Sequence, residues 1–184
     1  MNQGSTFIQQ LDNCPIGKIG SSKFEEICTE VLKFLFVPPL GEPTIQAQTL
    51  SKTKRRDAIF PNRNITATDN AAARNWHHLF LELNARMIVF EFKNYDKDDI
   101  GHEEVDQTRN YMTEEMGKLA IMICNKEPVK SAYTQRNSVY TKDKKIILFI
   151  TKKQLKEMLE MKDRGEEPSD FIIDLVERFY IQHE

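Results

Sequence analysis

Met87-Ile88-Val89-Phe90-Glu91-Phe92-Lys93 is the stretch of this sequence around which the rest is organised. It is a short run of mostly apolar, β-branched and aromatic residues between polar segments, a pattern that predicts a buried strand. Because side chains alternate across a strand, Glu91 and Lys93 share one face. The opposite face carries Ile88, Phe90 and Phe92. The sequence therefore predicts a carboxylate and an ammonium side by side at the end of a core strand.

Charged groups in a core strand carry a cost of roughly several kcal/mol unless they are paired or hold a metal. One interpretation is that Glu91 and Lys93 pair with each other or extend to the surface at the strand end. The other is that both belong to a functional site. The strand alone does not decide between them, so the choice rests on the residues around it.

Length and composition are those of a single globular domain, with 40% hydrophobic and 29% charged residues in 184. No apolar run approaches the roughly 20 residues of a transmembrane helix. The first residues, Met1 to Gly4, lack the basic region and apolar stretch of a secretory signal. Cys14, Cys28 and Cys124 are odd in number and widely spaced, which predicts reduced, mostly buried thiols and no zinc site. We therefore expect a cytoplasmic protein without a membrane segment.

The net charge of −2 hides a local imbalance. Basic residues gather around one acid, Asp57, whereas the segment 96–115 is strongly acidic. The basic residues are Lys52, Lys54, Arg55, Arg56 and Arg63. Such a patch predicts contacts to nucleic acid phosphates. The alternative is a solvated strand edge, which is a common position for charged runs.

Periodicity divides the chain into alternating strands and helices. Strands are predicted over 44–50, 55–60, 87–93, 118–124 and 145–151. Helices are predicted from Ser21-Ser22 to a point before Pro38-Pro39, and over 71–83, 103–116, 131–139, 154–161 and 171–181. We expect an N-terminal arm or short helix over 1–20, a core over 22–151 and C-terminal helices over 152–184. The order predicts one α/β domain whose central mixed sheet is flanked by helices.

Glu25 lies beside the apolar stripe of the first long helix, where it could overlook a site at the edge of the core. Ser22-Lys23-Phe24-Glu25 also fits the S-x-x-E capping box, in which the glutamate only bonds back to the helix start. Both interpretations stay open from the sequence. On the helix after the central strand, Gln107 and Tyr111 are spaced i, i+4 and so share one face.

Three features now stand in one order: an acid at a strand end, Asp57; the E-x-K strand; and a helix with Gln107-Thr108-Arg109-Asn110-Tyr111. This order resembles the PD-(D/E)XK nuclease superfamily, especially the Mrr-type, Holliday-junction-resolvase-like and RecB-like branches with a Q-x-x-x-Y helix. The resemblance covers about Ser22 to Thr151. It implies a restriction-endonuclease-like fold with an αβββαβ core. Arg56 stands where the name motif has proline, and the predicted helix over 71–83 lengthens the connection between the two acidic strands.

The resemblance also implies a metal-dependent endonuclease. Mg²⁺, for which Mn²⁺ would substitute, would be held by Asp57, Glu91 and the backbone carbonyl of Phe92. Lys93 would stabilise the attacking water and the developing charge. Gln107 would orient Lys93, the water or a phosphate, Tyr111 would support Gln107, and Glu25 would be an outer acid.

These expectations leave several functions open. Phage defence by restriction and DNA repair both fit, and cutting both strands would suit a homodimer or a partner protein. The alternative is a catalytically silent nuclease-like module that binds nucleic acid or assembles with other proteins. A coincidental E-x-K strand is the third possibility, and it predicts that Asp57 and Glu91 lie far apart in space.

Overall fold

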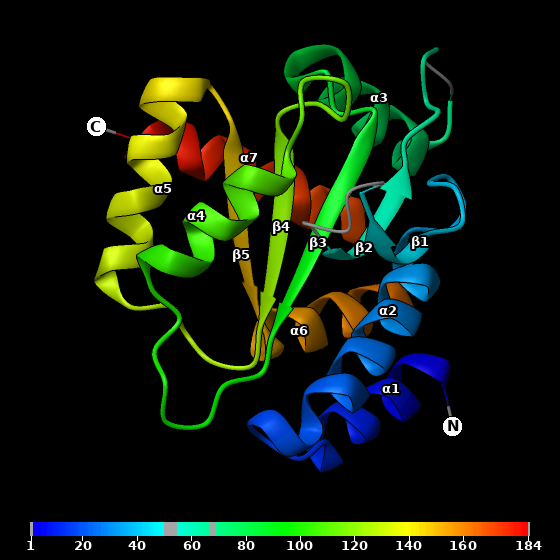
Figure 1. Cartoon of the computed structure of the whole chain (residues 1–184). Helices are drawn as coiled ribbons and strands as arrows, with labels where there is room; N and C mark the ends of the chain where they lie inside the picture. Colours follow the sequence, from blue (N-terminus) through cyan, green and yellow to red (C-terminus); the bar gives the residue numbers. More distant parts are fainter. Residues whose placement is uncertain (1, 50–54, 67–68, 184) are drawn as a thin grey trace.

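The computed structural model describes residues 2–49, 55–66 and 69–183. Within these ranges the chain forms a five-stranded sheet and seven α-helices (Figure 1). The strands are β1 Thr44–Gln48, β2 Arg55–Pro61, β3 Met87–Lys93, β4 Leu119–Cys124 and β5 Ile146–Thr151. The helices are α1 Gln3–Asn13, α2 Ser21–Phe36, α3 Ala71–Leu83, α4 His102–Tyr111, α5 Lys130–Asp143, α6 Lys152–Asp163 and α7 Pro168–Gln182, with a short 3₁₀ turn, η1, at Lys18–Gly20. The predicted α/β fold with a central mixed sheet is confirmed.

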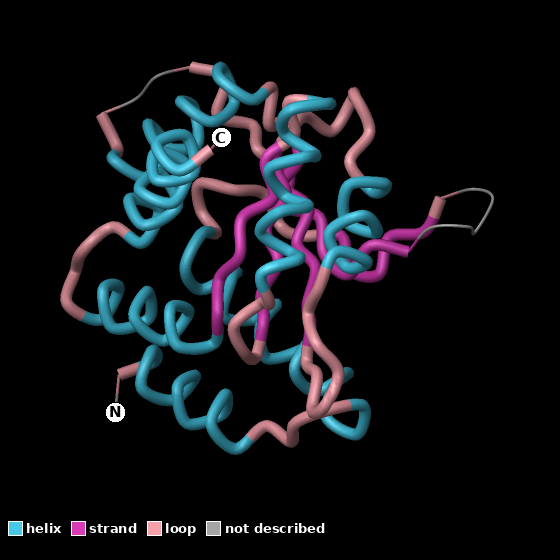
Figure 2. The backbone as a smooth tube through the Cα atoms, turned by 90° about the vertical axis from the view of Figure 1, so that its left-hand side faces the viewer, coloured by secondary structure: helices cyan, strands magenta, loops and turns pink. Residues whose placement is uncertain are grey.

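The sheet has the strand order β1-β2-β3-β4-β5. The first three strands pair antiparallel, and β3, β4 and β5 pair parallel. Ala58 of β2 lies opposite Phe90 of β3, so α3, which the chain forms between these strands, does not separate them. Figure 2 shows the β1–β2 ribbon extending away from the body of the molecule. The central strand is thus the point where the antiparallel and parallel halves meet.

Helices cover both faces of the sheet, as Figures 1 and 2 show. One apolar cluster joins α2, α3, α6 and α7 to the face of β3 that carries Ile88, Phe90 and Phe92. The other cluster joins α4 and α5 to the face that carries Val89. The alternation predicted for the central strand is therefore confirmed. Because parallel strands are buried on both faces, β4 and β5 are continuous apolar runs in the sequence.

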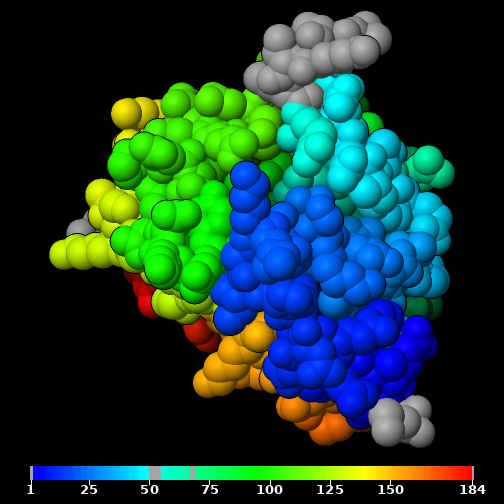
Figure 3. Space-filling model, turned by 60° about the horizontal axis from the view of Figure 1, so that its bottom comes forward, coloured from blue at the N-terminus to red at the C-terminus, as the bar shows by residue number. Residues whose placement is uncertain are grey.

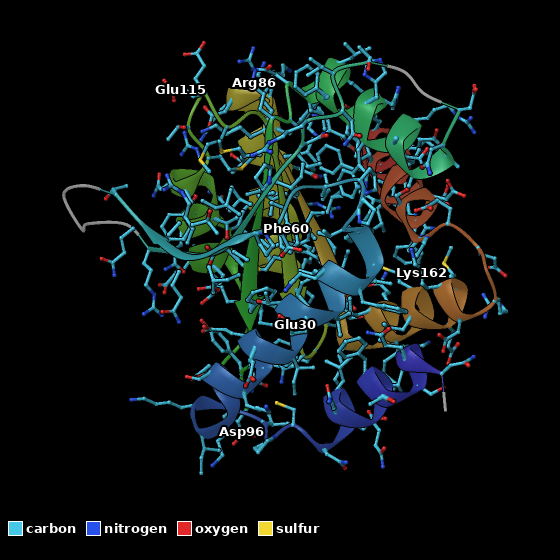
Figure 4. The ribbon with its side chains drawn as sticks, turned by 90° about the vertical axis from the view of Figure 1, so that its right-hand side faces the viewer. Glu30, Phe60, Arg86, Asp96, Glu115 and Lys162 are labelled. Atoms are coloured by element: carbon cyan, nitrogen blue, oxygen red, sulfur yellow. The ribbon has the colours of Figure 1, made fainter. Side chains whose placement is uncertain are left out.

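The two ends of the chain contribute to the core. The segment predicted as an arm or short helix contains α1, which packs on α6 and buries Leu11 completely. In Figure 4, Phe60 lies in the interior and Lys162 projects from α6 towards α2. Lys162 Nζ lies 3.5 Å from the carbonyl oxygen of Leu35, near the end of α2.

Within the described ranges, no helix is long and apolar enough to cross a membrane.

The helix predicted over 103–116 was wrong at its C-terminal end, since α4 ends at Tyr111. Its last carbonyl groups accept hydrogen bonds from two distant cations. Arg56 Nε donates to the carbonyl oxygen of Tyr111 over 3.0 Å, and Lys145 Nζ donates to that of Met112 over 2.6 Å. Met112 and Met116 are buried as predicted, but in the turn after the helix. The sequence pattern thus predicts a longer helix than α4, whose end is bound by hydrogen bonds from distant residues.

At Gly117 the turn after α4 packs closely against Asn84, at the end of α3. Its φ is +104°, and an added Cβ would lie 2.0 Å from the carbonyl oxygen of Asn84. Gly165 has a similar φ of +79°, but an added Cβ would meet nothing within 4 Å. We expect Gly165→Ala to lower the free energy of unfolding by about 1 kcal/mol through backbone strain alone. Gly117→Ala should cost roughly twice that or more, because the backbone must also shift.

Urea denaturation of the two variants beside the wild type measures this difference. Since both positions share the left-handed conformation, Gly165→Ala is the matched control for backbone strain. Equal losses of stability in the two variants would contradict the close packing of the turn against Asn84.

Candidate active site

Asp57 and Glu91 come together on neighbouring strands. The antiparallel register that places Ala58 opposite Phe90 brings Asp57 next to Glu91 when it continues by one residue. Asp57 Oδ2 also accepts a hydrogen bond of 2.9 Å from the backbone N–H of Phe92. Among the described residues, Asp57 forms no ion pair with an arginine, which was the ordinary structural alternative for this acid. The possibility that the two acids lie far apart was wrong.

Lys93 lies between the central strand and helix α4. Its Nζ donates a hydrogen bond of 2.9 Å to Oε1 of Gln107, whose Nε2 donates to the hydroxyl oxygen of Tyr111 over 2.8 Å. The same Nζ is 3.8 Å from Glu91 Oε2, near the outer limit for an ion pair. The structure therefore brings together the E-x-K pair and the two residues predicted to support it. Simple pairing of Glu91 with Lys93 does not account for the arrangement, since the shortest contact of Lys93 is to Gln107.

Glu91 is nearly sealed from solvent, with 2% of its surface exposed. One of its carboxyl oxygens, Oε1, is buried and has no hydrogen-bond partner among the described residues. Burial, together with the nearby Asp57 carboxylate, raises the pKa of Glu91 to about 8, although Lys93 acts in the opposite direction. Glu91 therefore combines an unpartnered oxygen with a carboxyl group that resists ionisation.

These groups face an open pocket of about 1000 Å³. The pocket is lined by all six residues predicted to be catalytic, namely Glu25, Asp57, Glu91, Lys93, Gln107 and Tyr111, and also by Phe92. Figure 3 shows the face where the N-terminal segment, β1 and β2, and the segment after β3 meet. In Figure 4, Asp96, another residue of this pocket, lies beside the N-terminal end of α2. Residues from distant parts of the sequence therefore share one solvent-accessible site.

Glu25 faces the pocket instead of capping its helix. Helix α2 begins at Ser21 after Gly20, and no side chain caps its N-terminus, so the predicted capping box was wrong. Gln46 of β1 is hydrogen-bonded to Glu25. Burial and the nearby Asp57 carboxylate raise the pKa of Glu25. The remaining interpretation, an outer acid at the edge of the site, agrees with this position.

Arg55, Arg56 and Arg63, the described residues of the predicted basic patch, do not form one exposed surface. Arg55 lines the pocket, but Arg56 is only 7% exposed and donates to the Tyr111 carbonyl, so it supports α4 and is not available to a phosphate backbone. Arg63 is exposed beyond Pro61, at the end of β2 remote from Arg55. Lys52 and Lys54 lie outside the described residues.

Lys18 and Asn94 line the pocket but were not predicted as site residues from the sequence. Asn94 is buried directly after Lys93, and its Nδ2 donates to the carbonyl oxygen of Pro15 over 2.9 Å and to that of Gly17 over 3.3 Å. These bonds hold the N-terminal loop at the pocket and place Lys18 in its lining. The polar residue after the E-x-K strand was a signal for Asn94, whereas nothing in residues 1–20 pointed to Lys18.

The prediction that the cysteine residues are buried thiols is confirmed. Cys14, Cys28 and Cys124 are free and buried. His77 Nδ1 lies 2.8 Å from the carbonyl oxygen of Asn64, and His78 contacts Glu82 over 2.9 Å. In the described parts of the chain, no three His, Cys, Asp or Glu side chains form a group that could hold a metal. The acidic pair Asp57 and Glu91 therefore acts with other oxygen ligands if a cation binds.

Comparison with known proteins gives one distant relative. No protein family model matches the chain, and no solved structure matches it. The transposon gamma-delta 80.3 kDa protein of Escherichia coli (strain K12) is 27% identical over 113 residues. The match covers 61% of this chain and 15% of that protein, so the chain spans a small part of its relative's length. The likeness is too distant and too partial to show a family.

The raised pKa of Glu91 predicts that the metal-free protein loses stability as pH rises. Folded Glu91 keeps its proton until about pH 8, whereas in the unfolded chain its pKa is the ordinary 4.5. Unfolding therefore releases a proton between these pH values, and the free energy of unfolding falls by up to about 1.4 kcal/mol per pH unit. Glu25, with its raised pKa, contributes in the same direction.

Urea denaturation in EDTA from pH 5 to pH 8 measures this slope. Glu91→Gln should remove most of it, because glutamine does not titrate. The exposed Glu103 of α4 provides the control, and Glu103→Gln should keep the wild-type slope. A full slope in Glu91→Gln would show that other groups cause the dependence.

Proposed function

We propose that this chain is a metal-dependent nuclease that hydrolyses phosphodiester bonds, with DNA as the expected substrate. The observation that carries the proposal is the joining of Lys93, Gln107 and Tyr111 into one hydrogen-bonded chain beside the acids Asp57 and Glu91. All five residues line one open pocket. They are the residues on which the resemblance to PD-(D/E)XK nucleases rests, and their meeting in space was not required by their order in the sequence.

The residues fit a divalent cation. Glu91 presents a buried oxygen without a partner, and Asp57 lies close enough to raise the pKa of Glu91. Mg²⁺ is commonly held by one or two carboxylates, with water and phosphate oxygens as its other ligands. Phe92, whose carbonyl the resemblance adds to the ligand set, also lines the pocket. When bound, such an ion neutralises phosphate charge and lowers the pKa of a bound water.

The chain's own residues supply the remaining functions. Lys93 places a positive charge at the acidic pair, where it stabilises a water that loses its proton and the charge that develops on phosphate oxygens. Gln107 holds the Lys93 ammonium through Oε1, and Tyr111 fixes the orientation of the Gln107 amide. Arg55, Lys18 and Lys97 line the pocket and are placed to contact the phosphates of a bound strand. Such contacts position the backbone and carry no sequence information.

The E. coli relative supports a context in DNA metabolism only through the word transposon in its name. We infer that the chain acts in defence against foreign DNA or in DNA repair, in the cytoplasm. Cleavage of both strands would suit a homodimer or a partner protein that presents a second site.

Plasmid cleavage tests the proposal. Supercoiled plasmid is incubated with the wild type in Mg²⁺, in Mn²⁺ and in EDTA, and nicked and linear products are quantified. We expect cleavage in both metals and none in EDTA. Asp57→Ala and Lys93→Ala should each lower the rate by about 100-fold or more, because each removes a charge needed at the reacting phosphate. Lys153→Ala, which removes an exposed lysine of α6, is the control and should cleave like the wild type.

The supporting residues should give a graded response in the same assay. Gln107→Ala releases Lys93 and should have a larger effect than Tyr111→Phe, which removes only the hydroxyl group that contacts Gln107. Cleavage that survives in Asp57→Ala and Lys93→Ala would place the activity elsewhere. Binding of DNA without cleavage by any folded form would favour the silent nuclease-like module.

A further inference from the structure

A second pocket lies at the β5 edge of the sheet, between α5 and α7. Its volume is about 250 Å³, and it shares no lining residue with the acidic pocket. Its polar lining comes from two arginines, Arg136 and Arg178, and from Thr151, Gln154, Gln182 and one acid, Glu127. The Tyr133 hydroxyl donates a hydrogen bond to Glu127. The lining therefore carries two guanidinium groups and one carboxylate that already has a donor.

The Arg136 guanidinium is surrounded by aromatic rings. Its Cζ lies 4.9 Å from the ring centroid of Tyr133, 5.2 Å from that of Phe149 and 5.0 Å from that of Phe179. Cation–π contacts of this kind hold the plane of the guanidinium in place. The rings come from α5, β5 and α7, so three separate elements fix one positively charged group at the pocket.

Arg136 has no acceptor within the described part of the chain. None of the hydrogen bonds or ion pairs found there involves it, and its Nε is buried without a partner. Burial lowers the pKa of Arg136, and the opposing effect comes from Tyr133. An arginine carries five N–H donors, and a buried donor without an acceptor, such as the Nε–H of Arg136, is costly. A group held in this state is prepared to receive an anion.

The chemistry of the pocket selects the type of anion. A guanidinium binds phosphate with two parallel hydrogen bonds, and Arg178 adds a second positive charge in the lining. Thr151 and Gln154 cap the N-terminus of α6, whose dipole also favours negative charge at this end. Thr151 ends β5, and the carboxyl ends of parallel strands are common ligand sites. A volume of about 250 Å³ suits a small anion better than a whole nucleotide.

We propose that this pocket, around Arg136 and Arg178, is a binding site for a phosphate group. The group can come from inorganic phosphate or from the terminal phosphate of a nucleic acid strand, because both present the same tetrahedral oxyanion. The site is separate from the acidic pocket and does not depend on cleavage there.

Phosphate binding to the full chain tests this inference in EDTA, so that no nuclease activity is involved. Sodium phosphate is titrated at constant ionic strength against sodium chloride, and binding is measured by calorimetry and by the shift in melting temperature. The wild type should bind phosphate and melt at a higher temperature with it. Arg136→Met keeps an apolar stem among the rings and should abolish the shift, and Arg178→Met should weaken binding roughly tenfold.

Arg86→Met is the matched control, because Arg86 also lies over an aromatic ring, Phe80, but is outside the pocket. It should bind phosphate like the wild type. If Arg136→Met does not fold, as judged by circular dichroism, the loss in Arg178→Met carries the test. The proposal would be overturned if phosphate had no effect on the wild type, or if it bound both pocket variants as tightly as the wild type. Arg136 would then be only a packing residue.

Two further ligands distinguish the sources of the phosphate. Short oligonucleotides with a 5′-phosphate or a 5′-hydroxyl group are compared in the same calorimetric assay. If the phosphorylated form binds at least tenfold more tightly than both the hydroxyl form and inorganic phosphate, the ligand is a strand end. If the phosphorylated form binds no more tightly than inorganic phosphate, the site serves the free anion.

Discussion

The burial of Glu91 and Lys93 on one face of a core strand is the constraint on which the site depends. Neither group can be satisfied by solvent, since Glu91 is 2% exposed and Lys93 is 7% exposed. Lys93 gains its closest partner from α4 through Gln107, and Glu91 meets Asp57 from β2. The mixed sheet makes this possible, because β3 pairs antiparallel with the strand that carries Asp57 and parallel with the strand that follows α4. The site therefore forms where the two halves of the sheet meet.

This constraint also explains why residues outside the site matter to it. Arg56 binds the last carbonyl of α4, and that helix carries both Gln107 and Tyr111. Asn94 holds the N-terminal loop against the end of β3. Arg56 and Asn94 each donate to backbone carbonyl groups, whereas one carboxyl oxygen of the buried Glu91 has no donor among the described residues. In a native fold such an exception calls for an explanation, and the cation that we propose at the acidic pair would provide one.

Most of the fold could be predicted from the sequence because its strands and helices have strong periodicity. The five strands and the helices from α2 to α7 lie where periodicity placed them. The meeting of Asp57 with Lys93 and Gln107 also depends on the pairing of β2 with β3, which the order of the residues along the chain does not by itself require. Predictions failed where a distant contact outweighed a local pattern. Glu25, in the S-x-x-E motif, faces the pocket and does not cap its helix. Helix α4 ends earlier than predicted, where Arg56 and Lys145 donate hydrogen bonds to its C-terminal carbonyl groups. Arg56 is therefore buried and does not belong to an exposed basic patch. None of these contacts leaves a local signal in the sequence.

Whether Asp57 and Glu91 hold a cation can be measured by the binding of Mn²⁺ to the protein at pH 7, with electron paramagnetic resonance detecting the free ion. Mn²⁺ is suited to this because it takes the same oxygen ligands as Mg²⁺. The account predicts saturable binding by the wild type and its loss in Asp57→Asn and Glu91→Gln, with both variants folded. Unchanged Mn²⁺ binding in both variants, or none in the wild type, would contradict the assignment of the acidic pair as a cation site.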